Sequence, residues 1–189
     1  DMMSQNGVSR EEVKIAKELT IPGYKDFYHF LSDLIPVAYR QSDGSILQHT
    51  DTPIYARYIF ADDPSYKSQK PLSVDDLKQI LGRVRNEKLS QQEIIKRIHN
   101  NIAQILASKD ISQVYRLFAQ LTDHGGFKNN LELTDLYLQL FGQDAQTPAK
   151  RVYHGHNPSV VGGYNSGKVI GLDYGINPYY GGNKKISRA

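Results

Sequence analysis

Two short runs of strand-forming residues, each ending in a histidine, lie on either side of a long segment with helical periodicity. The first run spans residues 46–49 and ends at His49, and the second spans residues 151–156 and ends at His156. Both runs are rich in apolar, β-branched or aromatic residues, which is typical of buried β-strands. Strands before and after a helical block commonly belong to one sheet. We therefore expect an α/β core in which both histidines lie at strand ends.

Local signals predict the elements around these runs. An Asp-Gly pair at residues 43–44 joins two apolar segments and predicts a β-hairpin. Ser90 and Glu93 form a capping box at the start of the clearest helix. Residues 50–71 are rich in Asp, Pro and Tyr and are expected to form an ordered loop, and residues 162–167 a turn. Spaced apolar residues predict helices over residues 9–19, 24–34, 72–88, 90–108, 112–121 and 131–141.

Composition excludes several kinds of site. The chain has 189 residues, enough for one core or for one core with a subdomain. It contains no cysteine, so any metal must be bound by His, Asp, Asn or Glu. Its 23 basic and 20 acidic residues are interspersed, and the net charge of +3 gives little reason to expect a nucleic-acid partner. No apolar run approaches the roughly 20 residues of a membrane span, so we expect a soluble protein.

The residues around the two histidines resemble motifs of the calcineurin-like metallophosphoesterases. Residues 155–158, Gly-His-Asn-Pro, are similar to the Gly-His-Thr-Pro strand end of that family, and residues 173–175, Asp-Tyr-Gly, to its Asp-Thr-Gly turn. His49, in Gln-His-Thr-Asp, is similar to the His-Ala-Asp strand end of the bacteriophage-type protein phosphatases. The resemblance implies that His49 and His156 bind the same one of two divalent metal ions. Manganese is the first choice, with iron, zinc or magnesium as alternatives.

Other residues near these motifs have alternative interpretations. His154 lies two residues before His156, and in a strand both point to the same face, so His154 is an alternative ligand or a group that supports the ligand. The resemblance places Asp173 and Tyr174 at the rim of the metal site. His124 stands in a His-Gly-Gly sequence, the commoner motif of the family, but it follows helical spacing and is expected to be structural.

A second resemblance concerns the cation that binds phosphate. Residues 70–85 are similar to a stretch of the bacteriophage-type phosphatases in which Pro-Val-Asp precedes Arg-x-Arg, and the first arginine there contacts phosphate. This match assigns the catalytic phosphate contact to Arg83, with Arg85 as its competitor and Arg57 as a more distant candidate. A guanidinium suits the role because it donates two parallel hydrogen bonds to phosphate oxygens.

Three further motifs of the family do not occur in these 189 residues: Asp-x-His, Gly-Asp-x-x-Asp-Arg-Gly and Gly-Asn-His-Asp/Glu. They carry the ligands of the other metal and the bridging aspartate. Asp1 matches the last residue of Gly-Asn-His-Asp. We therefore expect an upstream segment of the same protein to be the partner that supplies these groups, and the chain to be inactive without it.

The resemblance implies part of a metallophosphoesterase β-sandwich flanked by helices. Residues 1–86 and 149–189 correspond to the C-terminal portion of a phosphatase core, and residues 87–148 to an inserted helical subdomain similar to those of the Wip-type bacterial effector phosphatases. The implied activity is hydrolysis of phosphoprotein monoesters by a metal-activated water, in the cytoplasm or in a host cell after secretion as an effector. A dinucleoside polyphosphate hydrolase is one alternative. A non-catalytic interaction module on a degenerate scaffold is another, because Asn157 and Tyr174 each replace a threonine.

Overall fold

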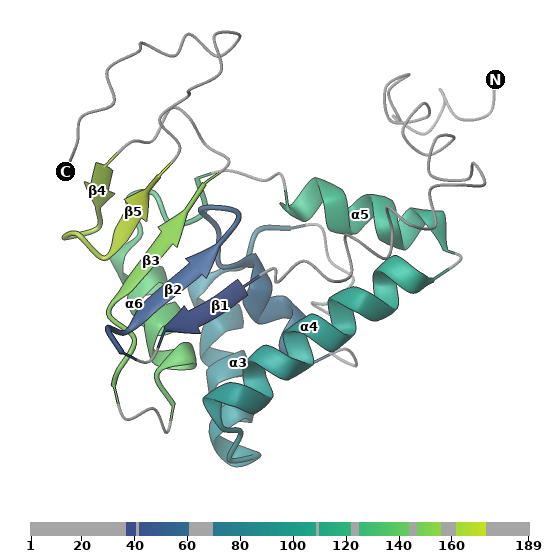
Figure 1. Ribbon diagram of the computed structural model, residues 1–189, viewed down its shortest axis with the longest axis horizontal. Coiled ribbons are helices and arrows are strands. Elements are labelled where there is room, and N and C mark those ends of the chain that lie inside the picture. Colours follow the sequence, from purple (N-terminus) through teal and green to yellow (C-terminus); the bar gives the residue numbers. More distant parts are fainter. Residues whose placement is uncertain are drawn as a thin grey trace, which may run out of the picture.

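The chain folds into a mixed sheet packed against helices (Figure 1). A computed structural model of the protein describes residues 37–40, 42–60, 70–108, 110–121, 125–143, 147–155 and 162–172. The expected α/β class is confirmed for this part of the chain. The helices predicted over residues 9–19 and 24–34 lie outside it, as does Asp1.

The described strands form one five-stranded open sheet. They are β1 (Val37–Arg40), β2 (Ser45–Gln48), β3 (Arg151–His154), β4 (Gly162–Tyr164) and β5 (Val169–Gly171), in the order β1-β2-β3-β5-β4. The central strands β2, β3 and β5 are parallel, and β1 and β4 are antiparallel edge strands. The strands before and after the helical block therefore share one sheet, as the sequence predicts. The second sheet of a sandwich is not among the described residues.

The hairpin between β1 and β2 forms where the Asp-Gly pair predicts it. Gly44 adopts a φ of 74°, in the left-handed region that glycine enters without steric cost. A Cβ at this position would lie 2.4 Å from the Pro148 carbonyl oxygen. The Asp43 carboxylate accepts a hydrogen bond from the Ser45 amide at 2.9 Å. Glycine is therefore required here both by the backbone angle and by the approach of the segment that precedes β3.

Among the described residues, four α-helices follow the hairpin and end close to the predicted boundaries. They are α3 (Val74–Asn86), α4 (Gln91–Ala107), α5 (Ile111–Leu121) and α6 (Leu131–Phe141). The predicted capping box of Ser90 and Glu93 is present at α4, and Ser73 with Asp76 forms a second one at α3. None of the helices in the described ranges is both long enough and apolar enough to cross a membrane.

Two segments differ from the sequence prediction. The expected loop over residues 50–71 contains a 3-10 helix, η2 (Ile54–Ile59), in which every residue is buried. A segment that is buried on all sides shows no alternation of apolar and polar residues, so its periodicity gives no signal. The expected turn over residues 162–167 begins with β4, whose pairing with β5 overrides the low strand propensity of Gly162 and Gly163.

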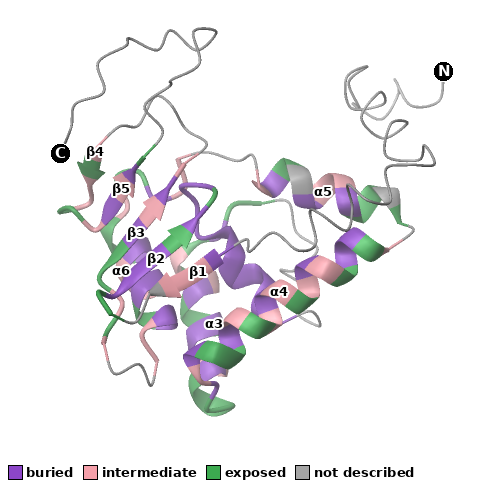
Figure 2. Ribbon diagram, viewed as in Figure 1, coloured by how far each residue is buried: buried purple, intermediate pink, exposed green. Residues whose placement is uncertain are grey.

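The core lies between the sheet and the helices behind it. In Figure 1, α3 and α6 cover the rear face of the sheet, and α4 and α5 extend to one side. Buried residues gather on these facing surfaces (Figure 2). Residues of the strands, such as Ile46 and Val152, belong to the same hydrophobic cluster as Ile98 of α4 and Leu140 of α6. The helical block thus shares its core with the sheet.

Helix α6 runs antiparallel to β2 and β3. Just before α6, the Phe127 amide donates to the carbonyl of Asp51, which follows β2. At the other end of α6, a Cβ on Gly142 would lie 3.2 Å from the amide nitrogen of Ala149, which precedes β3. The start of α6 therefore lies at the carboxyl ends of these strands, and its end lies at their amino ends.

Candidate functional site

The carboxyl ends of β2 and β3 lie side by side, and we call this place the histidine end of the sheet. In the parallel pairing, Gln48 lies opposite His154. The next residues, His49 and Gly155, are therefore neighbours, and a Cβ on Gly155 would lie 4.0 Å from the His49 carbonyl oxygen. His49 is exposed. His156 itself lies outside the described residues, so the predicted convergence of the His49 and His156 rings stays a prediction.

Residues 49–53, which we call the β2 turn, are fixed by a buried amide. The Gln48 side chain donates to the carbonyl oxygens of Thr50 at 2.6 Å and Thr52 at 2.9 Å. The Tyr137 hydroxyl of α6 donates to the side-chain oxygen of Gln48 at 2.7 Å. The buried hydroxyls of Thr50 and Thr52 also lie within hydrogen-bond distance of each other, at 2.9 Å. Because hydrogen bonds in the interior compete with little water, this network gives His49 a rigid base.

The segment between α5 and α6 closes over the β2 turn. Asp51 is fully buried, and its carboxylate accepts a hydrogen bond from the Gly125 amide at 2.8 Å. A Cβ on Gly126 would lie 2.9 Å from the Cβ of Thr52, closer than two carbon atoms approach without strain. The neighbouring His124 lies outside the described residues. Gly126 thus allows the backbone to approach the turn that carries His49.

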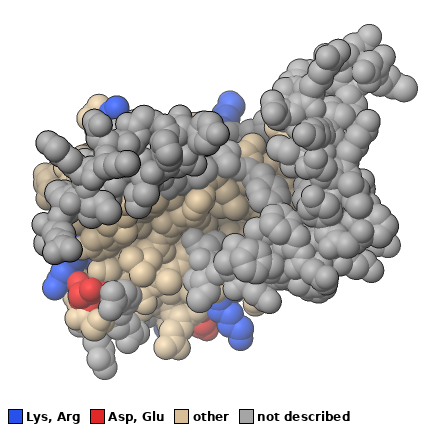
Figure 3. Space-filling view, turned by 45° about the horizontal axis from the view of Figure 1, so that its top comes forward, with Lys and Arg blue, Asp and Glu red and all other residues tan. Residues whose placement is uncertain are grey.

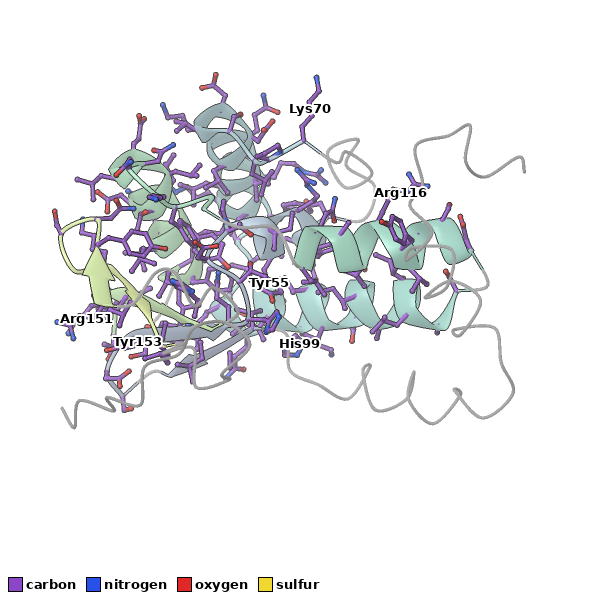
Figure 4. All side chains as sticks on the ribbon, turned by 90° about the horizontal axis from the view of Figure 1, so that it is seen from above. Tyr55, Lys70, His99, Arg116, Arg151 and Tyr153 are labelled. Carbon is purple, nitrogen blue, oxygen red and sulfur yellow. The ribbon has the colours of Figure 1, made fainter. Side chains whose placement is uncertain are left out.

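Tyr55 of η2 places a hydroxyl beneath the β2 turn. Its side chain is fully buried and points into the interior, whereas Arg116 and Arg151 point outward (Figure 4). Burial raises the pKa of Tyr55, and the nearby backbone of His49 partly opposes this rise. The hydroxyl nevertheless makes no well-formed hydrogen bond. A buried polar atom without such a bond is uncommon and is often explained by a bound water or ion.

His154 contacts residues on both sides of its ring. It is 1% exposed, with Nδ1 3.0 Å from the Gly155 carbonyl oxygen and Nε2 3.3 Å from the Tyr164 hydroxyl. The two rings meet edge to face at 6.1 Å between centroids. Burial raises the pKa of Tyr164, and the negative charge of Asp51 adds to the rise. Asp51, Tyr164 and His154 are therefore neighbours at the histidine end.

The structure places Arg83 and Arg85 away from the histidine end. Both lie in the last turn of α3, which runs alongside α6 in the same direction. This direction follows from the ion pair of Lys78 with Glu132 at 2.8 Å and the hydrogen bond of Arg85 to Gln139 at 3.4 Å. Because α6 ends at the amino ends of β2 and β3, the last turn of α3 also lies toward that side.

Arg83 is engaged in what we call the Arg83 cluster, which consists of Phe60, Arg83, Glu87 and Arg97. The Arg83 guanidinium lies over the Phe60 ring, 3.8 Å from its centroid, and Arg97 lies 5.6 Å from the same centroid. Glu87 is 3.8 Å from Arg83 and 2.9 Å from Arg97. The third candidate, Arg57, is buried in η2 and donates to the Lys70 carbonyl. Arg83 and Arg57 thus both contact other groups within the folded chain.

Two further surfaces of the described residues offer no second site among the predicted residues. A cavity of about 250 Å³ lies between η2, α4 and α5, and it contains none of the predicted site residues. On the face shown in Figure 3, the described residues present mainly uncharged atoms, with few charged side chains at the margins. The described ranges contain no group of three or more His, Asp or Glu side chains arranged to hold a metal ion.

The remaining predicted site residues lie outside the described part of the chain. These are Asp1, His124, His156, Asp173 and Tyr174. Four residues around His49 received no role from the sequence, namely Asp51, Tyr55, Tyr137 and Tyr164. The Gln-His-Thr-Asp sequence contains Asp51 and offers a local signal for it, but the tyrosines come from η2, α6 and β4 and are brought together only by the tertiary fold.

Comparison with known proteins adds no relative. No family model matches the chain, and neither a curated protein nor a solved structure is significantly similar to it.

Proposed function

We propose that this chain is part of a metal-dependent phosphatase in which His49 and His156 hold one divalent ion at the histidine end of the sheet. The observation that carries the proposal is the parallel register of β2 and β3. It makes His49 a neighbour of Gly155, the residue that precedes His156. Imidazoles from adjacent strand ends are a common way to present nitrogen ligands to zinc, iron or manganese.

The residues at this end fit a bound cation. His49 is exposed, and the Gln48 side chain holds the carbonyl of the next residue, Thr50, which suits a ligand that must be accessible but fixed in position. The buried Tyr55 hydroxyl lies beside the same backbone. Two histidines do not complete a coordination shell. Further ligands, including those of a second metal, are expected from the upstream motifs named above.

Each part of this site has a distinct task in the proposal. His49 and His156 would bind the ion, and the Gln48–Tyr137 pair would hold the β2 turn in place. When bound, a divalent pair supplies an activated water and neutralises charge on the phosphoryl group. Phosphoprotein monoesters are the leading substrate class, and a dinucleoside polyphosphate is the alternative. Arg83 lies toward the opposite end of the strands, so a phosphate at the ion would need another cation.

That position of Arg83 favours a second candidate function. A protein that keeps the metal-binding strand ends but directs its arginines to Phe60 and Glu87 would bind metal without turning over phosphate esters. This is the non-catalytic interaction module. The two functions differ in one measurement, because only the phosphatase hydrolyses an aryl phosphate when the complete protein is supplied with Mn²⁺.

The test of metal binding uses His49→Ala and His156→Ala in the 189-residue chain. We expect each substitution to weaken Mn²⁺ binding, followed by electron paramagnetic resonance, by about tenfold or more, since loss of even a supporting residue costs 10–100-fold. In the complete protein, the same substitutions should abolish Mn²⁺-dependent hydrolysis of an aryl phosphate.

The matched control is His99→Gln on α4. The His99 ring donates from Nε2 to the Val37 carbonyl at 2.8 Å, and glutamine keeps a donor there, so Mn²⁺ binding should not change. Equal Mn²⁺ affinity in wild-type protein and in the His49 and His156 variants would contradict the proposal.

A further inference from the structure

His154 has two ring contacts that together select one tautomer of the neutral ring. A carbonyl oxygen only accepts hydrogen bonds, so the Nδ1 atom that lies 3.0 Å from the Gly155 oxygen must carry a proton. In a neutral imidazole the other nitrogen is then an acceptor. The Tyr164 hydroxyl, 3.3 Å from Nε2, is placed to donate to that acceptor. Both ring nitrogens are therefore used within the protein.

This arrangement bears on the choice between His154 and His156 as ligand. A histidine binds a metal through an unprotonated nitrogen, and in His154 that nitrogen faces Tyr164. The side chain is also 1% exposed, whereas the His49 side chain is exposed. To reach an ion beside His49, the His154 ring would have to leave both of its partners.

The Gly155 carbonyl belongs to the peptide that joins Gly155 to His156. A hydrogen bond to this oxygen restrains the plane of that peptide, and it therefore restrains the direction in which the chain leaves β3. The strand end itself is held from the other side, where the Leu172 amide donates to the His154 carbonyl at 2.8 Å. His154 is thus placed to control the start of the segment that carries the predicted ligand.

We propose that His154 is a positioning residue: it donates from Nδ1 to the Gly155 carbonyl and accepts from Tyr164 at Nε2, and so orients the Gly155–His156 peptide for metal binding. This inference rests on the proposed function. Tyr164 serves as the partner that keeps the ring in the Nδ1-protonated form. Asp51, held by the Gly125 amide, lies near Tyr164 and belongs to the same buried group.

The first test needs no metal. Long-range proton–nitrogen correlation spectra of the wild-type chain, recorded at about pH 8, report which ring nitrogen carries the proton. The His154 signals are assigned by their loss in a His154 variant. We expect His154 to be protonated at Nδ1, and a Tyr164→Phe variant to shift the Nε2 resonance. Protonation of His154 at Nε2 would overturn the inference whether or not the protein is a phosphatase.

The second test compares His154→Asn with His154→Gln, using Zn²⁺ alone as the probe. The asparagine amide nitrogen is as many bonds from Cα as Nδ1, so asparagine keeps the donor to Gly155. Glutamine places its amide near the position of Nε2 and loses that donor. We expect the asparagine variant to retain most of the Zn²⁺ affinity and the glutamine variant to lose about tenfold or more.

The outcomes separate the two proposals. If His154 were itself a ligand through Nε2, the asparagine variant would lose Zn²⁺ binding as completely as the glutamine variant, and the Nε2 resonance of wild-type His154 would move on Zn²⁺ addition. Either result overturns the positioning role. If instead Zn²⁺ binding does not depend on His49 or His156, the proposed function fails, while the spectra of the metal-free chain still decide the protonation of His154.

Discussion

The β2 turn is held by buried hydrogen bonds, whereas the Arg83 cluster is held by contacts that water can reach. At the turn, Thr50 and Asp51 are fully buried and Gln48 nearly so. In the cluster, the side chains of Arg83 and Glu87 are 35% and 40% exposed. Buried hydrogen-bonded groups lose much when one partner is removed, and exposed ion pairs lose little. Buried hydrogen bonds therefore suit a segment that must hold a metal ligand in position. Exposed ion pairs are sufficient to anchor a helix surface.

Two glycine substitutions, one beside the β2 turn and one in the helix that carries Arg83, should change stability in opposite directions. The first is the largest effect expected. Gly126→Ala places a Cβ 2.9 Å from Thr52 Cβ, and overpacking of this kind costs about 1–3 kcal/mol in the free energy of unfolding. Gly82→Ala, in the middle of α3, meets nothing within 4 Å and should stabilise by about 0.8–1 kcal/mol because alanine is the better helix former. Urea unfolding of both variants measures the difference. Equal and small effects would show that the β2 turn is not tightly packed.

A second variant removes one hydrogen bond from the turn. Tyr137→Phe deletes the hydroxyl that donates to Gln48 and leaves a buried amide oxygen without that donor, which should cost about 1–2 kcal/mol. Tyr153→Phe is the matched control: Tyr153 is half-buried and lies on β3, and substitutions without a buried polar partner stay within about 0.5 kcal/mol. Thermal unfolding of the pair distinguishes them. A Tyr137 variant as stable as the control would remove the support assigned to Gln48.

The smallest effect is expected in the Arg83 cluster. Glu87→Gln removes the acid between Arg83 and Arg97, and exposed ion pairs contribute about 0–1 kcal/mol. The loss of stability should become smaller as salt is added, because salt screens the attraction between exposed charges. Urea unfolding at low and high salt measures both quantities. A loss as large as that of Tyr137→Phe would mean that the cluster behaves as a buried network.

Local sequence patterns predict much of the fold but few of the residues that surround the candidate site. The Asp-Gly hairpin, the capping box of α4 and the bounds of α6 follow from short-range signals, which do not depend on the rest of the chain. The burial of η2 has no such signal, because some of its polar groups bond to residues that are distant in the sequence. For Asn101, for example, the side chain donates to the Tyr58 carbonyl at 2.7 Å.

The same limit explains the position of Arg83. The sequence identifies a helix that contains this residue, but the direction of α3 relative to the sheet depends on its packing against α6. Likewise, two-residue periodicity places His154 and Ile46 on definite faces of their strands, yet it does not show that Tyr164 meets the His154 ring. The predicted ligand His49 was accessible to sequence reasoning because a strand end is a local feature.

The parallel pairing of β2 with β3 also has a consequence for how the chain reaches its folded state. These two strands are adjacent in space but are separated along the chain by α3, α4, α5 and α6. Closing so long a loop costs conformational entropy before the pairing gives any return, and folds with many such distant contacts form slowly. Helix α6, which contacts Gln48 of β2 through Tyr137 and ends beside the approach to β3, would shorten the effective loop once it has docked. Formation of the histidine end is therefore expected to be a late event in folding, with the helices already in place.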